Sequence, residues 1–457
     1  MNRFCDIVGG LVALFIASSS VQAAIRYVKP TSSGTGDCTS WANACNLPDG
    51  LSAAQSGDEI WCRSGTYDGF DLKNAVKIIG GFAGTETNAS QSDPTTNQSI
   101  IDGGVVGSDN EASTVLRGFT IRNGLSGVDG EGGGIALKNS SAMIVQCIIE
   151  DNATGDFGGA VGVNGGSPQF ISCIFRNNGQ GAANPLQTKG GGAVFIREGT
   201  PLFVNCLFDN NKAWEGGVLL VMSGRPTFIN CTIVNNEATI GTGGAFNDPD
   251  GKASFQNCVF RTNKTAQGEA RYSLGFSGSG GTTEIRYSNA QGGWTGTGNI
   301  DANPLFQSFV GGNYELKSTS PCKNTGDSSA LPADSGDLDW DGNTTEPIPL
   351  DLARFTRVGL GSVDMGAYEF GCHTGSPDCD FDEIPDTCEI EADPTLDCTN
   401  QNGILDLCET NPSIPRGACC VGPTCNWPTT SCQCTAGGGE WHQGKKCFQV
   451  TCGIPTE

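Results

Sequence analysis

One pattern of glycine, cysteine and asparagine recurs five times between Gly132 and Asn263, and it limits the possible fold more than any other feature. Each copy has a Gly-Gly pair, a Cys fourteen residues later and an Asn five residues after the Cys. Successive copies lie 25 to 33 residues apart, which indicates a repeat architecture. The members are Gly132/Gly133, Gly158/Gly159, Gly191/Gly192, Gly216/Gly217 and Gly243/Gly244; Cys147, Cys173, Cys206, Cys231 and Cys258; and Asn152, Asn178, Asn211, Asn236 and Asn263.

The residues around each Cys favour short strands. A Phe stands three residues before four of the five cysteines, and Phe or Ile stands two residues after them, in runs bounded by Gly, Asn and Pro. No copy has ten or more residues with helical apolar spacing, which excludes leucine-rich, ankyrin and tetratricopeptide repeats. We therefore predict an all-β solenoid of short parallel strands.

Stacked coils would align equivalent residues in ladders, because neighbouring strands pair at about 4.8 Å. We expect the Asn ladder at a tight bend, since Asn tolerates left-handed backbone and its amides can hydrogen-bond between coils. The Gly-Gly ladder should mark a second bend. The ladder cysteines are either buried thiols or disulfides between coils, and we favour thiols.

The chain varies in length at one place in the pattern. The gap from an Asn to the next Gly-Gly pair runs from four residues (212–215) to twelve (179–190), while the other spacings are constant. Insertions at one corner of a solenoid often line its binding face. The loops 153–157, 179–190 and 237–242 are therefore either a surface for glycans or other cell-surface and matrix components, or loops without a ligand.

The first residues have the features of an export signal. Arg3 precedes an apolar stretch at 7–17, and Val21 and Ala23 fit a signal-peptidase site, so residues 1–23 are assigned to a signal peptide. No later stretch has the roughly 20 apolar residues that span a bilayer. Without Cys5, 21 cysteines remain, a high count that suits an extracellular or cell-surface location; because the number is odd, at least one thiol is expected to be free or to pair between molecules.

The charge of the chain disfavours two classes of partner. A net charge of −23 and a pI near 4.4 disfavour nucleic acids and anionic membranes, because both require clustered Lys and Arg. An acidic exterior suits a calcium-rich medium.

Residues 24–102 are expected to form the N-terminal cap and first strands, with a short amphipathic element at 41–54, a strand at 59–62 and a turn at 64–67. The phrases SWANA, GDEIWCRSGTY and IIGGFAGTET, with the repeated GGA...C.F..N, resemble bacterial right-handed β-helix surface proteins and the polymorphic outer-membrane protein repeat. The resemblance implies a right-handed parallel β-helix of the pectin-lyase-like kind. We place its coils at 103–299, with Phe119 at the Cys rung and Gly124 at the Asn rung of an early coil.

Residues 300–371 are the expected closing region. NPLF, YELKSTSPC, DLDWDGN and VDMGAYEF resemble the closing region of planctomycete-type β-helix proteins with interchangeable C-terminal anchors. That family has an acidic residue shortly after Ser-Pro, where this chain has Cys322-Lys323-Asn324, and a disulfide through Cys322 is the expected substitute. Asp337, Asp339 and Asp341 with Gly342 could form a cation loop, but Ile348 stands in place of the closing carboxylate and we favour a plain turn.

Two acidic loops within residues 372–412 have the ligand spacing of an EF-hand calcium site. Glu383 replaces the turn Gly and Pro394 prevents an exiting helix, so the segment resembles a thrombospondin type 3 or dockerin-like loop. We predict structural calcium; the alternative is a solvated acidic linker pinned by its cysteines. The ligands are Asp378, Asp380, Asp382, the Ile384 carbonyl, Asp386 and Glu389 in the first loop, and Asn400, Asn402, Ile404, Asp406 and Glu409 in the weaker second one.

Residues 413–457 are expected to form a disulfide-rich module. Seven cysteines lie between Gly417 and Gly453, and so small a core needs cross-links. The segment resembles a small cysteine module of the same bacterial proteins. A zinc site is the competing interpretation, but clean C-x-x-C pairs are missing and His442 is the nearby histidine.

Catalytic residues are not evident in the coils. His373 and His442 both lie outside them. Glu150, Asp151, Asp209 and Glu237 look scattered, without a cluster at matching rungs for a calcium-dependent lyase or two carboxylates within roughly 5 to 10 Å for a hydrolase. We expect an exported, calcium-stabilised structural or adhesive surface protein; the alternative is a polysaccharide lyase or glycoside hydrolase acting on acidic polysaccharide.

Overall fold

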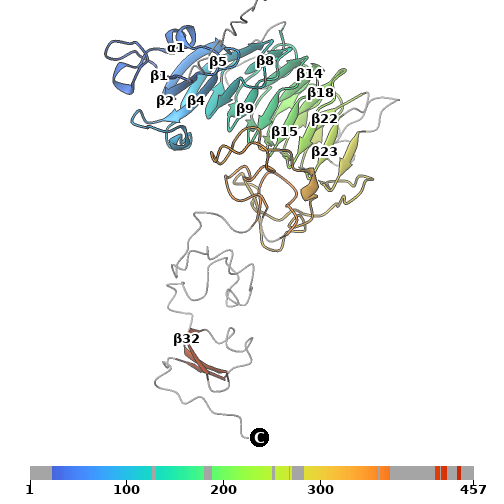
Figure 1. Cartoon of the computed structure of the whole chain (residues 1–457). Coiled ribbons are helices and arrows are strands. Elements are labelled where there is room, and N and C mark those ends of the chain that lie inside the picture. Colours follow the sequence, from blue (N-terminus) through green and yellow to red (C-terminus); the bar gives the residue numbers. More distant parts are fainter. Residues whose placement is uncertain are drawn as a thin grey trace, which may run out of the picture.

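The computed structural model describes residues 23–125, 130–179, 188–249, 253–266, 283–358 and 361–370, and the backbone of short strands at 268–269, 417–421, 424–429 and 440–443. Within these residues the chain winds into stacked coils of short parallel strands (Figure 1). The predicted all-β, right-handed parallel β-helix is confirmed. Both calcium loops, nearly all of the expected signal peptide and most of the cysteine module lie outside the described residues.

Ten parallel strands form sheet 1, which supplies one strand to each coil. Its order follows the chain, so each coil stacks directly on the one before it. The strands are β1 (Ile25–Val28), β2 (Glu59–Arg63), β4 (Lys77–Phe82), β6 (Val115–Arg117), β9 (Met143–Val145), β12 (Gln169–Ile171), β15 (Leu202–Val204), β19 (Thr227–Ile229), β23 (Ser254–Gln256) and β27 (Glu284–Arg286).

Sheet 2 has two arms that meet at the long strand β5 (Ser99–Ser108), and β3 (Gly65–Asp71) pairs with β5. One arm follows the cysteines and the other follows the Gly-Gly pairs. The post-cysteine arm contains β7 (Phe119–Arg122), β10 (Ile148–Glu150), β13 (Ile174–Arg176), β16 (Leu207–Asp209), β20 (Thr232–Val234), β24 (Val259–Arg261) and β28 (Asn289–Ala290). The post-glycine arm contains β8 (Ile135–Lys138), β11 (Val161–Asn164), β14 (Val194–Glu198), β18 (Leu219–Val221) and β22 (Phe246–Asn247).

Short elements complete the described fold. A third sheet lies at the variable corner, and two antiparallel sheets lie C-terminal to the coils. The third sheet has β17 (Lys212–Ala213), β21 (Glu237–Ala238), β25 (Lys264–Thr265) and β26 (Gly268–Glu269); the others are β29 (Phe306–Ser308) with β30 (Asn313–Leu316), and β31 (Gly417–Val421), β32 (Thr424–Thr429) and β33 (Glu440–Gln443). The helical turns are η1 (Trp41–Asn43), α1 (Leu47–Ala53), η2 (Ala89–Gln91) and η4 (Ser328–Ala330).

The Gly-Gly pairs form the predicted bend, and the two glycines of a pair are needed for different reasons. The first has left-handed backbone in every copy, with φ between 58° at Gly216 and 82° at Gly243. The second allows close stacking of the coils: a Cβ on Gly217 would stand 2.2 Å from the Gly244 carbonyl oxygen. An L-residue with a side chain is therefore strained at the first position and sterically blocked at the second.

The Asn ladder is buried and its amides bond from coil to coil, as predicted. Asn211 Nδ2 donates to Asn236 Oδ1 at 3.0 Å, and Asn211 Oδ1 accepts from Asn178 Nδ2 at 2.9 Å. The expected left-handed backbone is one residue away from the predicted position. It belongs to the residue before each ladder Asn, such as Asn177 (φ 58°) and Asn210 (φ 55°). The ladder Asn turns its side chain inward because the preceding residue makes the bend.

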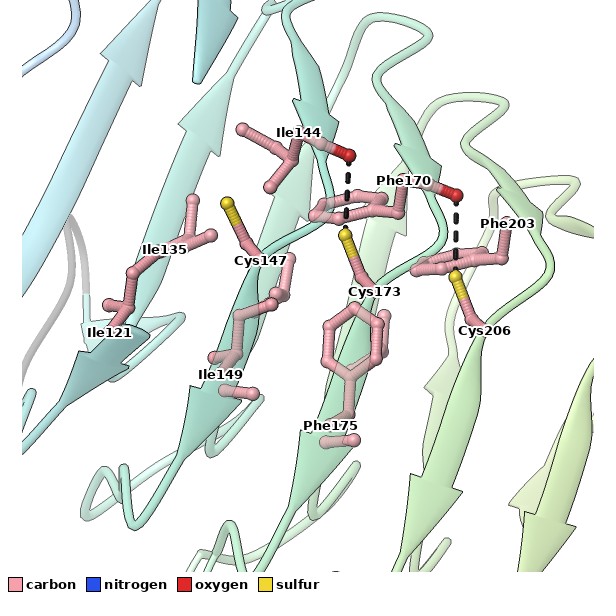
Figure 2. Close-up of a cluster of buried hydrophobic side chains, with 14 of the residues drawn as sticks. Ile121, Ile135, Ile144, Cys147, Ile149, Phe170, Cys173, Phe175, Phe203 and Cys206 are labelled. Carbon is pink, nitrogen blue, oxygen red and sulfur yellow. Dashed lines mark hydrogen bonds between the residues drawn. The ribbon is translucent and has the colours of Figure 1, made fainter. Parts of the chain in front are cut away.

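The ladder cysteines are free, buried thiols, which confirms the favoured interpretation. Each Sγ donates to a carbonyl of the preceding coil; Cys173 bonds to Ile144 O at 3.3 Å and Cys206 to Phe170 O at 3.4 Å (Figure 2). Burial raises the pKa of the Cys147 thiol to about 12. Between these thiols the Phe rungs stack, with 4.8 Å between the ring centroids of Phe170 and Phe203. The ladder thiols therefore pack as small apolar groups.

The N-terminal residues join the stack earlier than expected. The predicted turn at 64–67 is wrong, because Gly65–Asp71 is β3 and pairs with β5 in parallel. The amphipathic element at 41–54 divides into η1 and α1, at the N-terminal end of the stack in Figure 1. Asn46 caps α1 by accepting from Asp49 N, and a disulfide joins Cys38 to Cys45. Among the described residues no helix is long and apolar enough to cross a membrane.

The closing region lies along the side of the stack, in orange in Figure 1. Leu338 and Ile348 pack on the outward apolar residues of sheet 1, and Phe306, Tyr314 and Met365 pack on those of the post-cysteine arm. The expected disulfide at Cys322 is wrong: its thiol is free and buried, and accepts from Asn289 Nδ2 at 2.9 Å. The region is held by apolar contacts and hydrogen bonds to the coils.

Replacement of one ladder amide should destabilise the whole stack. Asn211→Asp removes two donors and places an unpaired charge among buried groups, so we expect a loss of about 3 to 5 kcal/mol in the free energy of unfolding. The neighbouring Asn210→Asp makes the same change at an exposed position, and should cost about 0.5 kcal/mol or less. Urea denaturation followed by circular dichroism measures both; equal effects would contradict the role of the ladder.

Candidate functional site

The closing region folds an acidic turn against sheet 1. Ala333 and Pro347 form an antiparallel bridge, and Asp334 N donates to Glu346 O at 2.8 Å. Between them, buried Leu338 packs against the apolar residues of sheet 1. Two segments that are twelve residues apart in sequence are thereby held side by side.

Arg117 of β6 attaches this turn to the coils. Its guanidinium donates to the carbonyl oxygens of Gly336, Asp337 and Leu338 at 2.9 to 3.2 Å. The same group lies over the Trp340 ring, 3.8 Å from the centroid. Arg117 thus binds backbone and an aromatic face, and none of the described ion pairs joins it to a carboxylate of the turn.

The turn brings carboxylates together in two overlapping groups that share Asp339. Asp334, Asp339 and Glu346 have oxygens within 4.8 Å of one another, and so do Asp337, Asp339 and Asp341. Asp334 is fully buried; its Oδ2 accepts from Leu338 N at 2.7 Å, but its Oδ1 has no hydrogen-bond partner. Both carboxylate oxygens of Glu346 are likewise buried and unpartnered.

The electrostatics of this acidic turn are unbalanced. Residues 324–353 contain no Lys, Arg or His. Burial raises the pKa of Asp334 to about 6, and the neighbouring charges of Asp339, Glu346 and Asp337 add to the rise. Buried carboxylate oxygens without donors are costly unless a cation or a proton compensates them. Hard oxygen ligands at this spacing suit Ca²⁺ better than a soft metal.

The acidic turn differs from the sequence prediction in its ligand set. The expected turn at Asp337–Gly342 forms, with Gly342 N donating to Asp337 Oδ1 at 3.2 Å. However, the carboxylate that meets Asp339 and Asp334 is that of Glu346, while Ile348 is buried against the coils. Asp334 and Glu346 were missed because they lie outside the EF-hand spacing. A usable signal was the pair of acidic residues that flank the apolar Leu338 and Ile348.

The predicted calcium loops, Asp378 to Glu389 and Asn400 to Glu409, lie outside the described residues and stay predictions.

A charged rung runs along the outer face of the post-cysteine arm. Glu150 pairs with Arg176 in register, and Arg176 pairs with Asp209. The sequence predicted no cluster of carboxylates and a basic residue at matching rungs, but Glu150, Arg176 and Asp209 do share a rung, because each stands three residues after its ladder Cys. Glu150 binds Arg176 at 2.6 Å, while Asp209 accepts from Tyr314 OH at 2.9 Å and from Asn235 Nδ2 at 3.0 Å. Alternating signs stabilise stacked strands, and these contacts occupy both carboxylates.

The variable corner exposes apolar side chains beside charged ones. Trp214 is 36% exposed and Ile240 61%, and Ile240 N donates to Trp214 O across adjacent coils. On the third sheet, at the same corner, Glu237 Oε2 lies 3.4 Å from the Nζ atoms of both Lys212 and Lys264. The corner therefore offers an aromatic face bordered by lysines and carboxylates.

A second group of buried acids surrounds Arg357 in the closing region. Arg357 Nε lies 3.7 Å from Glu369 Oε2, and Arg357 Nη2 donates to the carbonyls of Asp364 and Gly366. Burial raises the pKa of Asp351 to about 6, and also raises the pKa values of Asp364 and Glu369. Asp334 has one oxygen without a partner, whereas both oxygens of Asp351 accept backbone hydrogen bonds, from Phe355 N and from Glu369 N, each at 2.8 Å. These contacts join separate segments of the closing region, which indicates a structural role.

The coils also match known proteins. Residues 85–291 match the family model described as the right handed beta helix region. The match lies within the coils and the strands that precede them. Among solved structures, the crystal structure of pectate lyase Pel9A is similar, at 13% sequence identity and a TM-score of 0.38, covering 76% of this chain and 96% of that chain. No curated protein matches in sequence. The chemistry of this chain has to be argued from its own residues.

The acids around Arg357 should make stability depend on pH. A raised pKa means that the folded state retains a proton, so the stability contribution of Glu369 is full in acid and is lost as the pH rises through its folded-state pKa. Glu369→Gln mimics the neutral acid, and at pH 8 it should be about 2 kcal/mol more stable than the native protein. Urea denaturation from pH 5 to 8 measures this, with the exposed Glu111→Gln as control. Parallel profiles for all three proteins would contradict the assignment.

Proposed function

We propose that this protein is an exported, calcium-stabilised β-helix that serves as a structural or adhesive component of the cell surface and binds glycans through the variable corner. The observation that carries the proposal is the exposed Trp214 next to Ile240, on the corner where insertions accumulate. An exposed indole face stacks on the apolar face of a sugar ring, and the adjacent lysines and carboxylates would bond to its hydroxyl groups.

Two further features of the corner support a binding role over loops that have no ligand. Leu125, 52% exposed, also lies just after the Asn rung of its coil, so exposed apolar residues recur on this corner, although at different distances from the rung. The ion pair between Lys189 and Asp156, at 2.5 Å, adds a charged contact point on an adjacent coil. A repeating polymer would meet comparable groups on successive coils.

The rival function is a polysaccharide lyase or glycoside hydrolase acting on acidic polysaccharide. Its support is the rung of Glu150, Arg176 and Asp209, where two carboxylates flank an arginine on adjacent coils. The contacts of these groups favour a structural role: the Arg176 guanidinium already binds Glu150, and Tyr314 and Asn235 hold Asp209. A base must reach a substrate proton, which these partners obstruct.

Export and calcium binding at 378–389 and 400–409 complete the proposal. They rest on the sequence of residues 1–23 and on the ligand spacing of the two loops.

The two functions are separated by one experiment. The purified protein is incubated in Ca²⁺ with a panel of neutral and acidic polysaccharides, and both retention on the immobilised polymer and release of unsaturated or reducing ends are measured. Retention without new ends supports binding. Release of ends that is lost in Glu150→Gln would establish the enzyme instead.

Replacement of the corner tryptophan should weaken that retention. Trp214→Ala removes the stacking face, which is worth about 1.4 kcal/mol, so the apparent dissociation constant should rise about tenfold. Val310→Ala is the control, because Val310 is fully exposed but lies in the closing region. Affinity electrophoresis in gels that contain the retained polysaccharide measures both variants. Equal mobilities for Trp214→Ala and native protein would exclude the corner as the binding surface.

A further inference from the structure

We propose that Asp334, Asp339 and Glu346 bind a divalent cation of the calcium type, which fastens the closing region to the side of the coils. This site is distinct from the loops at 378–389 and 400–409, and it does not depend on glycan binding. It would take a hard cation held by carboxylate oxygens, with Asp337 and Asp341 at its exposed side.

The strongest support is the state of Asp334. The residue is fully buried, and its Oδ1 has no donor, although Oδ2 is satisfied by Leu338 N. This unpartnered oxygen belongs to the carboxylate that meets those of Asp339 and Glu346 within 4.8 Å. A buried acceptor is normally satisfied by a donor or a cation, and the two carboxylates that meet this one offer no donor when ionised.

Glu346 supplies independent support from the other side of the turn. Both of its oxygens are buried without a hydrogen-bond partner. The backbone holds it in this position, because Glu346 O accepts from Asp334 N and Pro347 bridges Ala333. This bridge fixes the two backbones side by side, so the two carboxylates are close in the observed side-chain positions, and a bound cation would balance their repulsion.

The geometry of the ligands suits calcium. Ca²⁺ takes six to eight oxygens at about 2.4 Å, so two of its ligand atoms lie up to about 4.8 Å apart. The oxygens of Asp334, Asp339 and Glu346 lie within that limit. Asp339 also meets Asp337 and Asp341, which are partly or fully exposed and leave room for water ligands.

The place of the site in the fold indicates what the ion would do. Arg117 of β6 holds the backbone of 336–338, and Leu338 and Ile348 bury apolar surface on sheet 1. The carboxylates belong to the same turn as these two anchors. A bound cation would remove the repulsion that opposes docking, so the closing region would stay on the coils in calcium and loosen in chelator.

Calcium counting and localisation together test the site on the full chain without its leader. Calorimetric titration gives the number of bound Ca²⁺ ions, and hydrogen–deuterium exchange shows which amides calcium protects. We expect Asp334→Asn/Glu346→Gln to bind one ion fewer than native protein, and calcium to protect 333–348 in native protein only. The exposed Asp339→Asn should weaken the same site at least tenfold without loss of fold.

Two comparisons keep the result specific. Asp382→Asn/Asp386→Asn removes ligands from the predicted first calcium loop, and should leave the protection of 333–348 unchanged. If that variant loses no ion while Asp334→Asn/Glu346→Gln does, the loop proposal fails and this one stands. Glu111→Gln, an exposed change outside the turn, should bind as native protein does. The proposal is overturned if both site variants retain the native stoichiometry and affinity, or if calcium leaves 333–348 unprotected in native protein.

Discussion

Backbone pairing between successive coils is the constraint on which the rest of this structure depends. Strands within the stack bond to their equivalents in the neighbouring coils, so a residue at a given position meets the residue at the same position of the next coil. Only side chains that tolerate identical neighbours can occupy the interior: phenylalanine rings stack, thiols bond to carbonyls, and Asn amides bond to each other. A charged residue repeated in the interior would repel its equivalents in the neighbouring coils.

The same constraint explains what the sequence reveals and what it hides. Positions at a fixed offset from the ladder Cys could be aligned by counting, so the bends, the buried thiols and the Asn ladder were predictable. The rung of Glu150, Arg176 and Asp209 was countable as well, since each residue stands three after its Cys, but its members differ in type and do not look like a repeat. The position of the left-handed residue was not predictable, because both Asn177 and Asn178 are compatible with a bend.

The closing region has no such register, and its contacts were accordingly missed. Asp334 and Glu346 meet through a bridge between Ala333 and Pro347 that no repeat dictates. Cys322 belongs to the segment that departs from the family pattern, and this departure suggested a disulfide. Its thiol is instead buried and accepts a hydrogen bond from Asn289. These positions are set by the docking of the closing region on the coils. Leu338 and Ile348 become buried because they pack on the outward apolar residues of sheet 1.

The closing region leaves some faces of the coils covered and others exposed. The closing region hides the outer faces of sheet 1 and part of the post-cysteine arm, and it ties Asp209 to Tyr314 in doing so. A ligand that approaches these covered faces would meet the closing region instead of the coils. The variable corner carries no such cover among the described residues, and Trp214 and Ile240 remain accessible there. The proposed binding at the corner and the proposed cation at the flank are thus compatible, because they involve different residues.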